Sequence, residues 1–312
     1  MQSGPSFSVI IPVRDRADVL MTCLQALCEV VPPQGGFEVI VVDDGSARMP
    51  ETAPFAERLS LVLLRNQGTP GPAAARNLGA HHARAAHLAF LDADCLPEPG
   101  WLAALQTGME RFPEGALLGG RTIDGCPDNR YSAASHRIID VVNGFYNQAA
   151  DQAHFLTTQN LAIPADRFRA AGGFREDFST SEDREFCDRW LRLGHRMVVV
   201  PEARVRHVHP MNLRAFWRRH FGYGQGAYRF HRLRALRNHQ GLRLAPPRFY
   251  LRLFGKPLTA GLRPRALATE ALMLLSQAAS TAGFLWEAAR TAVGVQSAPV
   301  DDRPGMGGSI KP

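Results

Sequence analysis

Short apolar runs alternate with helically spaced apolar residues through the first part of the chain. Four runs are typical of strands buried on both faces: Phe7–Ile11, Phe37–Val42, Leu59–Leu64 and His87–Leu91. Between them, Asp18–Cys28 and Pro72–Ala86 carry apolar residues at the spacing of a helix. Buried strands separated by helices are typical of a mostly parallel sheet covered on both faces. The pattern therefore predicts a doubly wound α/β fold.

The rest of the chain continues this body and then changes character near residue 210. The pattern predicts strands at Ala116–Arg121, Gln159–Ile163 and Met197–Val200, and helices at Pro97–Phe112, Ser132–Gln148, Glu182–Leu193 and Ala266–Arg290. We therefore expect a body over residues 1–210, with halves at 1–121 and 122–210. Residues 211–295 are expected to form a basic helical appendage, and residues 296–312 a flexible tail.

Charge is distributed unevenly along the chain, whose net charge is +7. Residues 214–265 contain 13 basic side chains and no acidic one, whereas the rest of the chain has 23 basic and 29 acidic side chains. The chain is therefore a mildly acidic body with a strongly basic C-terminal region. The five cysteines show no paired spacing, and the N-terminus shows no leader pattern. We expect a cytoplasmic protein without a disulfide framework or a zinc cluster.

Polar clusters follow three of the predicted strands. Pro12–Asp15 follows the first strand, Asp43–Ser46 the second, and Asp92-Ala93-Asp94 the fourth. Asp-Gly-Ser is also what a plain turn requires, but ligands of open α/β sheets bind outside the carboxyl ends of the strands. Two carboxylates that alternate at a strand end can serve a ribose and a divalent cation. Mg²⁺ or Mn²⁺ on a nucleoside diphosphate prefers such oxygen ligands.

The order of these motifs resembles family 2 glycosyltransferases. The nucleotide-binding half of that family is similar to SVIIPVRDR, EVIVVDDGS, NQGTPGPAAARNLGA and HLAFLDAD, and its acceptor side to QNLAIPADRFRAAGGFREDF and STSEDREFCDRW. The resemblance implies an inverting enzyme with the GT-A fold, whose nucleotide-binding half is 1–121 and whose acceptor half is 122–210. The later stretch VRHVHPMNLRAFWRRHFGYGQGAY resembles the rhamnosyltransferase-like branch, which implies a hexosyl- or deoxyhexosyltransferase.

The resemblance also gives roles to individual residues. It implies a nucleotide-sugar site formed by Pro12, Asp43, Asp44, Arg76 and Asp92. In that site Asp92 would face the ribose and Arg76 the base or phosphate side, while Asp94 would bind Mn²⁺ or Mg²⁺. The chain departs from the family at Arg14-Asp15, where an aromatic residue and an asparagine are usual. Arg14 is expected to add a phosphate or base contact, so the identity of the donor is not inherited.

Asp183 is the expected catalytic base. An inverting transfer needs a carboxylate to take the proton of the acceptor hydroxyl as that hydroxyl attacks the anomeric carbon. Asp183 lies at the start of a predicted helix, whose positive end favours an ionised carboxylate. A helix cap with acidic first-turn residues would explain the same sequence without catalysis. The position after Gly172-Gly173-Phe174 favours the base.

Two histidines, His207 and His209, alternate in an extended segment after Val205. In the resembling family a histidine at this place can complete the metal site, and imidazole is an acceptable ligand for Mn²⁺. A His-x-His pair also occurs as an ordinary surface or core feature. We predict His207 as the second metal ligand and leave His209 open.

The basic region suits two kinds of partner. Arginines interleaved with aromatic residues can bind nucleic acid or lie on an anionic membrane surface. A solvated arginine-rich surface without any partner would show the same composition. The apolar stretch Ala266–Trp286 is interrupted by Glu270 and Ser276, which favours an interfacial or packing helix over a transmembrane span. We expect a peripheral protein at the inner face of the plasma membrane, and nucleic acid is the less favoured partner.

Together these patterns predict a metal-dependent inverting glycosyltransferase that acts in the assembly of a cell-surface glycan. It would move a sugar from a nucleotide-sugar donor to a glycan or lipid-linked acceptor. A sugar nucleotidyltransferase is the rival enzyme, but it would need a glycine-rich basic loop where PVRDRADV stands. The sequence also allows a nucleic-acid-binding protein or an inactive glycan-binding relative, and the intact Asp94 and Asp183 argue against the inactive relative.

Overall fold

Two units make up the part of the chain that the computed structural model describes, which is residues 4–238, 246–254 and 264–292. Within those limits, unit 1 holds Met1–Ile123 and Asn147–Val208, and unit 2 holds Asp124–Tyr146 and His209–Asp302. The division groups residues 124–146, which are expected to belong to the acceptor half, with the basic C-terminal region. The predicted tail at 296–312 lies outside the described residues.

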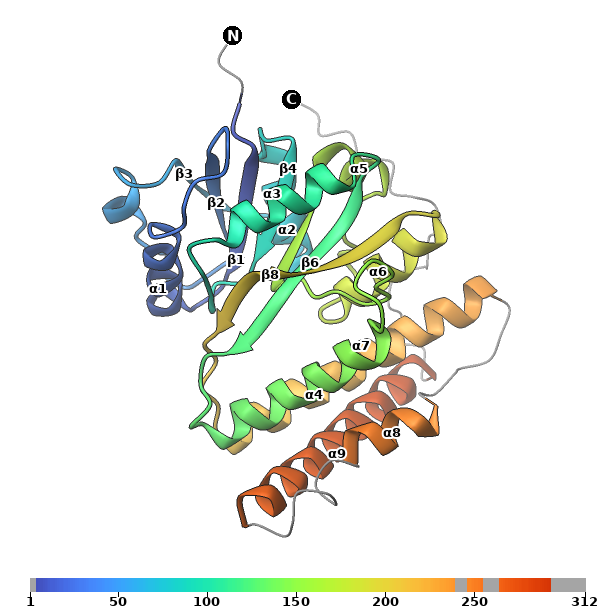
Figure 1. Ribbon diagram of the computed structural model, residues 1–312. Helices are drawn as coiled ribbons and strands as arrows, with labels where there is room; N and C mark the ends of the chain where they lie inside the picture. Colours follow the sequence, from blue (N-terminus) through green and yellow to red (C-terminus); the bar gives the residue numbers. More distant parts are fainter. Residues whose placement is uncertain (1–3, 239–245, 255–263, 293–312) are drawn as a thin grey trace. The chain divides into compact units, whose positions relative to one another are not determined.

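A single sheet forms the centre of unit 1 (Figure 1). Its strands are β1 Phe7–Val13, β2 Phe37–Asp43, β3 Leu61–Arg65, β4 His87–Leu91, β5 Cys95–Pro97, β6 Ala116–Asp124, β7 Asn160–Pro164 and β8 Arg196–His207. They lie in the order β3-β2-β1-β4-β7-β6-β8-β5. The first four pair in parallel, as predicted, whereas β7 runs antiparallel to β4 and β6, and β5 runs antiparallel to β8.

Helices cover both faces of this sheet, which explains the continuous apolar runs. They are α1 Ala17–Leu27, α2 Pro72–His82, α3 Trp101–Arg111, α5 Ala165–Ala170 and α6 Glu182–Arg192, with a 3₁₀ turn at Ala53–Phe55. In β1, Val9 and Ile11 share one core with α1 and α3, while Ile10 shares the other core with α2, α5 and α6. Because successive side chains of a strand point to opposite faces, nearly every position of β1 is apolar, and the buried Ser8 hydrogen-bonds Glu38 of β2.

Two expected elements near the strand ends differ from the structure. The predicted helix at 97–112 begins only at Trp101, because Cys95–Pro97 form the short strand β5. The strand predicted at Met197–Val200 continues to His207 as β8 and pairs with β5, so that Cys95 lies opposite His207. A strand as short as β5 has no periodic pattern, and its partner comes from a distant part of the chain.

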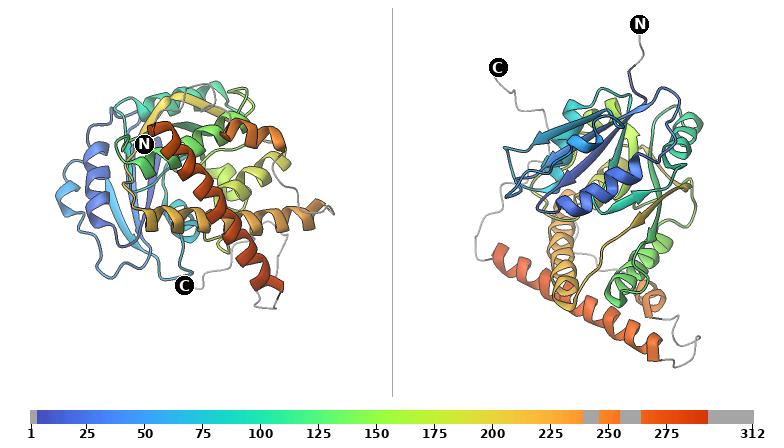
Figure 2. Two further views of the ribbon diagram at one scale, coloured as in Figure 1. Left: turned by 90° about the horizontal axis from the view of Figure 1, so that it is seen from below. Right: turned by 90° about the vertical axis from the view of Figure 1, so that its left-hand side faces the viewer.

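Unit 2 consists of helices: α4 Arg130–Tyr146, α7 Leu213–Asn238, α8 Pro247–Phe254 and α9 Pro264–Ala292. Helices α7 and α9 cross at close range (Figure 2). A methyl group at Gly224 would overlap the carbonyl oxygen of Ser280, and one at Gly283 would overlap that of Phe221. The missing side chains therefore let the two backbones touch. Among the described residues, no helix is both long enough and apolar enough to cross a membrane.

Candidate functional site

The two adjacent carboxylates at the end of β2 hold the surrounding loops. Asp44 accepts hydrogen bonds from the Asn66 side chain at 2.7 Å and from the Gly71 backbone N–H, whose nitrogen lies 3.1 and 2.9 Å from its two oxygens. Asp43 is fully buried, and its Oδ2 lies 3.3 Å from Arg65. Within the described residues that oxygen has no hydrogen bond. These contacts fix the loop that follows β3, and the predicted contact with a nucleoside stays a prediction.

Pro12 and Arg14 mark the end of β1 beside this loop. Pro12 pairs in register with Val42 of β2 and is half-buried. Arg14 is exposed, and its Nε lies 3.8 Å from the Asp15 carboxylate. Their place at a strand end agrees with the expected donor site, whereas their contacts with a donor remain predicted.

Arg76 of α2 is buried between two carboxylates from distant parts of the sequence. Its two terminal nitrogens lie 2.6 Å from Asp92 Oδ1 and 2.7 Å from Glu182 Oε1. Burial alone would lower the pKa of this guanidinium, but the charges of Asp92 and Glu182 raise it above its usual value. Arg76 therefore stays charged and ties the end of β4 to the start of α6. The predicted contact with a base or phosphate is untested, and both terminal nitrogens already bind protein carboxylates.

Asp183 is half-buried in the first turn of α6, next to Glu182. Its pKa is raised to about 7, because burial removes water and Glu182 adds a like charge, against the opposing effects of the Arg184 N–H and of Arg76. A carboxylate with this pKa can accept a proton near neutral pH. The capping explanation has less support, since among the described residues Ser181 makes no side-chain capping bond.

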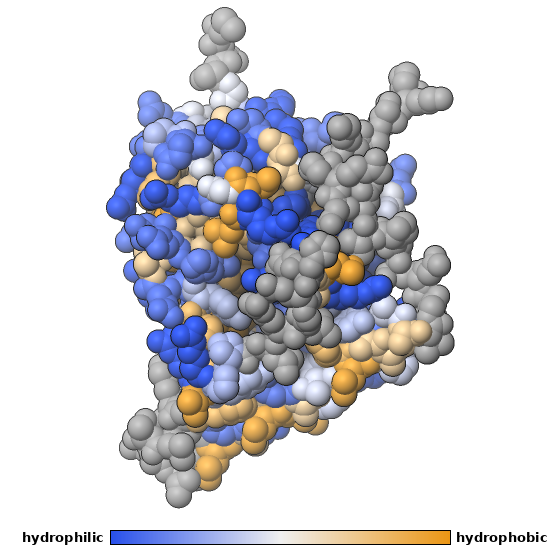
Figure 3. Space-filling model, turned by 90° about the vertical axis from the view of Figure 1, so that its right-hand side faces the viewer, coloured by the Kyte–Doolittle hydropathy of each residue, from blue (hydrophilic) through white to orange (hydrophobic). Residues whose placement is uncertain are grey.

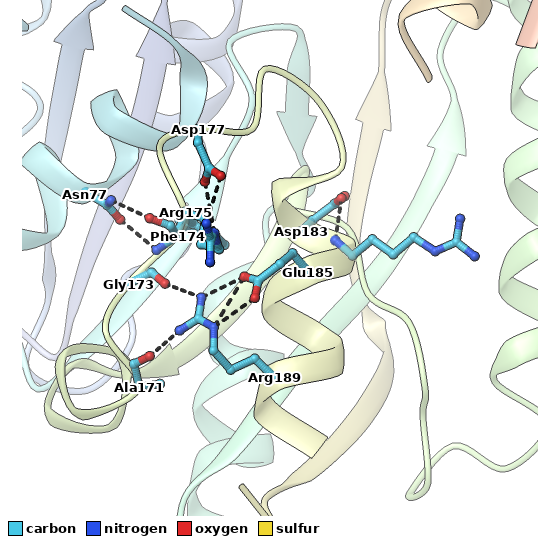
Figure 4. A network of polar contacts seen from close by, with 10 residues as sticks. Asn77, Ala171, Gly173, Phe174, Arg175, Asp177, Asp183, Glu185 and Arg189 are labelled. Carbon is cyan, nitrogen blue, oxygen red and sulfur yellow. Dashed lines mark hydrogen bonds and ion pairs between the residues drawn. The ribbon is translucent and has the colours of Figure 1, made fainter. Parts of the chain in front are cut away.

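Helix α6 is anchored on the glycine turn at residues 171–174 (Figure 4). Arg189 donates to two carbonyl oxygens of this turn and pairs with Glu185 at 2.9 Å. Asn77 of α2 makes two hydrogen bonds to the backbone of the same turn, at 2.8 and 2.9 Å. Figure 4 shows Asp183 pointing away from the Arg189–Glu185 pair. The turn therefore positions α6 while leaving the Asp183 carboxylate outside the anchoring contacts.

Asp94 and His207 face each other where β5 pairs with the end of β8. His207 Nε2 lies 3.3 Å from Asp94 Oδ1, and both side chains are buried. The Val208 N–H donates to the Asp94 carbonyl oxygen at 2.8 Å, which fixes the two segments side by side. With His209, these residues offer three ligand atoms that all lie within 4.8 Å of one another. One carboxylate and two imidazoles suit a divalent transition metal.

Two polar side chains complete the surroundings of Asp94 and His207. The Arg16 guanidinium lies 2.9 Å from Asp94 Oδ2, so this carboxylate already neutralises one positive charge. The Gln159 amide nitrogen lies 3.4 Å from His207 Nε2, and the buried Gln159 Oε1 has no hydrogen bond within the described residues. A buried oxygen without a hydrogen bond, near a carboxylate and an imidazole, is suited to contact a further bound group. The donor set therefore fits a metal ion.

Sequence reasoning gave no role to Arg16, Gln159 or Glu182. Arg16 and Gln159 stand inside the motifs SVIIPVRDR and QNLAIPADRF, and Glu182 directly precedes Asp183. Their position in the sequence could have indicated a role, since each is a polar residue at the border of an apolar run or helix. Their partners, however, are up to 106 positions away along the chain. Only the folded sheet brings such residues together.

The sequence of this chain matches a family model and several known proteins. A family model described as Glycosyl transferase family 2 matches residues 8–200. The chain is 33% identical over 237 residues to the pre-mycofactocin glycosyltransferase of Mycobacterium tuberculosis, covering 72% of this chain and 48% of that protein. It is 28% identical over 209 residues to glycosyltransferase AglE of Haloferax volcanii, covering 64% and 66%. The chain thus spans about half the length of the first of these relatives.

Solved structures share the fold. The mannosyltransferase PcManGT from Pyrobaculum calidifontis, in complex with GDP-Man and Mn²⁺, has a TM-score of 0.58 and 24% identity, covering 94% of this chain and 80% of that chain. TarS 1–349 of S. aureus, in complex with UDP-GlcNAc, has a TM-score of 0.55 and 17% identity, covering 93% and 92%. Likeness at such identities shows the fold alone, and it confirms the predicted GT-A fold.

Proposed function

Because the chain belongs to glycosyl transferase family 2, we propose that it transfers a sugar from a nucleotide-sugar donor to an acceptor hydroxyl, with inversion and with a divalent metal ion. One arrangement carries the proposal. Asp94 faces His207 at 3.3 Å, and two residues earlier Asp92 is linked through Arg76 to the start of α6, where Asp183 lies. A metal-holding set and a candidate base are thus connected by two short ion pairs.

Asp183 would serve as the base of this reaction. Its carboxylate would accept the proton of the acceptor hydroxyl while the hydroxyl oxygen forms a bond to the anomeric carbon. The bond from that carbon to the donor diphosphate breaks in the same displacement, and the configuration inverts. Arg76 would hold Glu182 and Asp92 in place, so that Asp183 keeps its position as the charge of the site changes.

Asp94 and His207 would hold the metal, for which Mn²⁺ and Mg²⁺ are the candidates. A bound divalent ion would neutralise the charge of the departing nucleoside diphosphate. Arg16 contacts Asp94 Oδ2, the carboxylate oxygen that does not face His207. It would add a further positive charge beside the diphosphate. Asp43, Asp44 and the exposed Arg14 would form the nucleoside and phosphate side, at the ends of β2 and β1.

The donor sugar and the acceptor are the finer part of the proposal. The similar structures hold GDP-Man with Mn²⁺ and UDP-GlcNAc, which supports a hexosyl donor on a nucleoside diphosphate, and a deoxyhexosyl donor is the alternative. We propose a glycan or a lipid-linked glycan as acceptor, in cell-surface glycan assembly at the cytoplasmic face of the membrane. Both relatives are named as glycosyltransferases, which supports the transfer of a sugar. Their names leave the identity of that sugar open.

Thermal unfolding with a panel of donors tests the proposal. UDP-, GDP- and dTDP-sugars are each added with Mn²⁺, with Mg²⁺ and with a chelator. A true donor present at 100 times its dissociation constant should stabilise the fold by about 2.7 kcal/mol, and only when metal is present. The matching nucleoside diphosphate should stabilise it as well. If no nucleotide sugar stabilises the chain under any metal condition, the proposed function is wrong.

A further inference from the structure

Helix α9 exposes an apolar face along most of its length. Leu267, Leu274, Leu285 and Trp286 are 51%, 59%, 61% and 57% exposed. Exposed alanines fill the spacing between them, at Ala268, Ala271, Ala278 and Ala289. These positions repeat every three or four residues and therefore lie mainly on one side of the helix. Between Leu267 and Ala289, a fully described stretch, no charged side chain of α9 is exposed.

Several polar groups of α9 lie on its buried side, whereas Thr281 and Arg290 are exposed. Ser276 is fully buried, and Glu287 is 4% exposed. Glu287 accepts from Arg229 at 2.8 Å and from Gln225 at 3.2 Å, both on α7, and Ser280 donates to the His220 carbonyl oxygen at 3.1 Å. A surface helix ordinarily buries its apolar stripe and exposes its polar one. Helix α9 buries Met273 and Ala279 together with these polar groups, and its other side exposes an apolar face that calls for an apolar neighbour.

Other helices of unit 2 also expose apolar side chains. Leu251 and Tyr250 of α8 are 73% and 39% exposed, and Leu236 of α7 is 52% exposed. Figure 3 shows apolar side chains gathered in a band along the helices at the lower edge of that view. Contiguous apolar surface of this kind marks an interaction site.

Positive charge surrounds this surface. Exposed arginines lie on all three helices, at Arg234, Arg248, Arg252 and Arg290. The two acidic residues that α7, α8 and α9 contain are both engaged, since Glu270 pairs with Arg137 at 3.1 Å and Glu287 with Arg229 at 2.8 Å. Among the described residues, the outer surface of these helices therefore presents arginine and no exposed carboxylate.

We propose that the exposed face of α9, together with the exposed residues of α8, lies on an anionic lipid surface. Leucines and a tryptophan would enter the apolar layer, while arginine stems cover apolar surface and their guanidinium groups reach lipid phosphates. Each basic residue near such a surface contributes about 1 kcal/mol. The helix lies along the interface in this arrangement, in agreement with the finding that no described helix is suited to cross a membrane.

Charge also decides against a second copy of the chain as the partner. Two copies joined through this face would bring the same arginine-rich surfaces together, and like charges placed against each other cost several kcal/mol. An anionic lipid surface supplies the opposite sign across the whole face. This inference concerns unit 2 alone and holds whether or not the proposed transfer reaction is correct.

Co-sedimentation of the full chain with vesicles tests the lipid surface. Vesicles of phosphatidylcholine alone are compared with vesicles that also contain phosphatidylglycerol, at low and high salt. The chain should bind the anionic vesicles roughly ten times more tightly or better, and salt should weaken that binding. Leu274→Gln with Leu285→Gln should weaken it by roughly ten-fold or more. The matched pair Val31→Gln with Leu193→Gln, 58% and 53% exposed in unit 1, should leave it unchanged.

Several results would overturn the proposal. These are negligible binding of the wild-type chain to both vesicle types, or equal binding by the Leu274/Leu285 variant that unfolds at the wild-type temperature. A dimer that this variant loses, without effect on vesicles, would assign the face to a second copy. Tight binding of duplex DNA that the variant lacks, again without effect on vesicles, would assign it to nucleic acid. Trp286→Gln provides a milder variant should the double substitution lower the unfolding temperature.

Discussion

The sheet of unit 1 and helix α9 of unit 2 differ in where carboxylates and apolar residues lie. In unit 1 the apolar residues of β1 enter the cores on both faces of the sheet, and carboxylates such as Asp43 and Asp94 stand at strand ends. In unit 2 helix α9 buries Glu287 and exposes Leu274. The polar groups at the strand ends of unit 1 are the predicted ligand-binding groups, whereas Glu287 of unit 2 joins two helices. The exposed apolar residues of α9 are those that we propose to contact lipid.

The Arg76 cluster of unit 1 and the Glu287 pair of unit 2 differ in their charge balance. In unit 1 a single guanidinium, that of Arg76, serves both Asp92 and Glu182, with Asp183 beside them. In unit 2 Glu287 has Arg229 at 2.8 Å, so its charge is matched. The surplus of negative charge in unit 1 contributes to the raised pKa of Asp183, after burial. Unbalanced buried charge is typical of a reactive site, and balanced buried charge of a structural contact.

The largest expected effect comes from the carboxylate at the metal site. Asp94→Asn should abolish transfer and weaken donor binding only when metal is present, because the substitution removes a hard anionic ligand. Both quantities are measured with Mn²⁺ and with a chelator. Asp18→Asn, at an exposed acid in the first turn of α1, is the matched control and should behave as wild type. Wild-type activity of Asp94→Asn would remove this residue from the metal site.

The next effect concerns the base. Asp183→Asn is nearly isosteric, so donor affinity should survive while turnover falls by roughly 100-fold or more, a typical contribution of a positioned base. Steady-state turnover and donor affinity are measured on the same preparation. An equal loss of both would show that Asp183 supports the fold of α6, as Glu182 does through Arg76, and takes no part in the reaction.

The pH dependence of transfer tests whether the surplus of negative charge around Asp183 affects the reaction. Since the pKa of Asp183 is raised to about 7, the carboxyl is protonated below that pH and cannot accept a proton. The wild-type rate should therefore fall about ten-fold per pH unit below 7 and level off above it. The residual rate of Asp183→Asn should not show this fall below pH 7. A wild-type rate that stays level down to pH 5 contradicts the assignment.

Much of unit 1 followed from the sequence, because its elements obey local rules. The runs that became β1, β2 and β4 are apolar at nearly every position, and such runs have few other ways to fold than as a buried strand. The polar residues at their ends were predicted as site residues from their place at the carboxyl ends of the strands and from the resemblance to the family. The short β5 has no such signal, yet it is the strand that brings Asp94 against His207.

Two features could not be derived from local pattern. The Arg76–Glu182 pair joins residues 106 positions apart, and only the fold decides that α2 and the start of α6 meet. In α9, apolar residues occur on all sides of the helix, so the pattern predicts a helix without identifying its buried face. The crossing at Gly224 and Gly283 decides that face, since both backbones must approach there.

The smallest expected effect tests which face of α9 is buried. Met273 is fully buried and its neighbour Leu274 is 59% exposed, although both are apolar residues of similar size in the same helix. Met273→Ala should lower the free energy of unfolding by about 2 kcal/mol or more, since it leaves a cavity between helices. Leu274→Ala should change that free energy by less than about 0.5 kcal/mol, because little packing is lost at an exposed site. Denaturant unfolding without lipid measures both. Equal costs would mean that Leu274 is already packed in the free chain, and α9 would then lack the exposed apolar face that distinguishes unit 2.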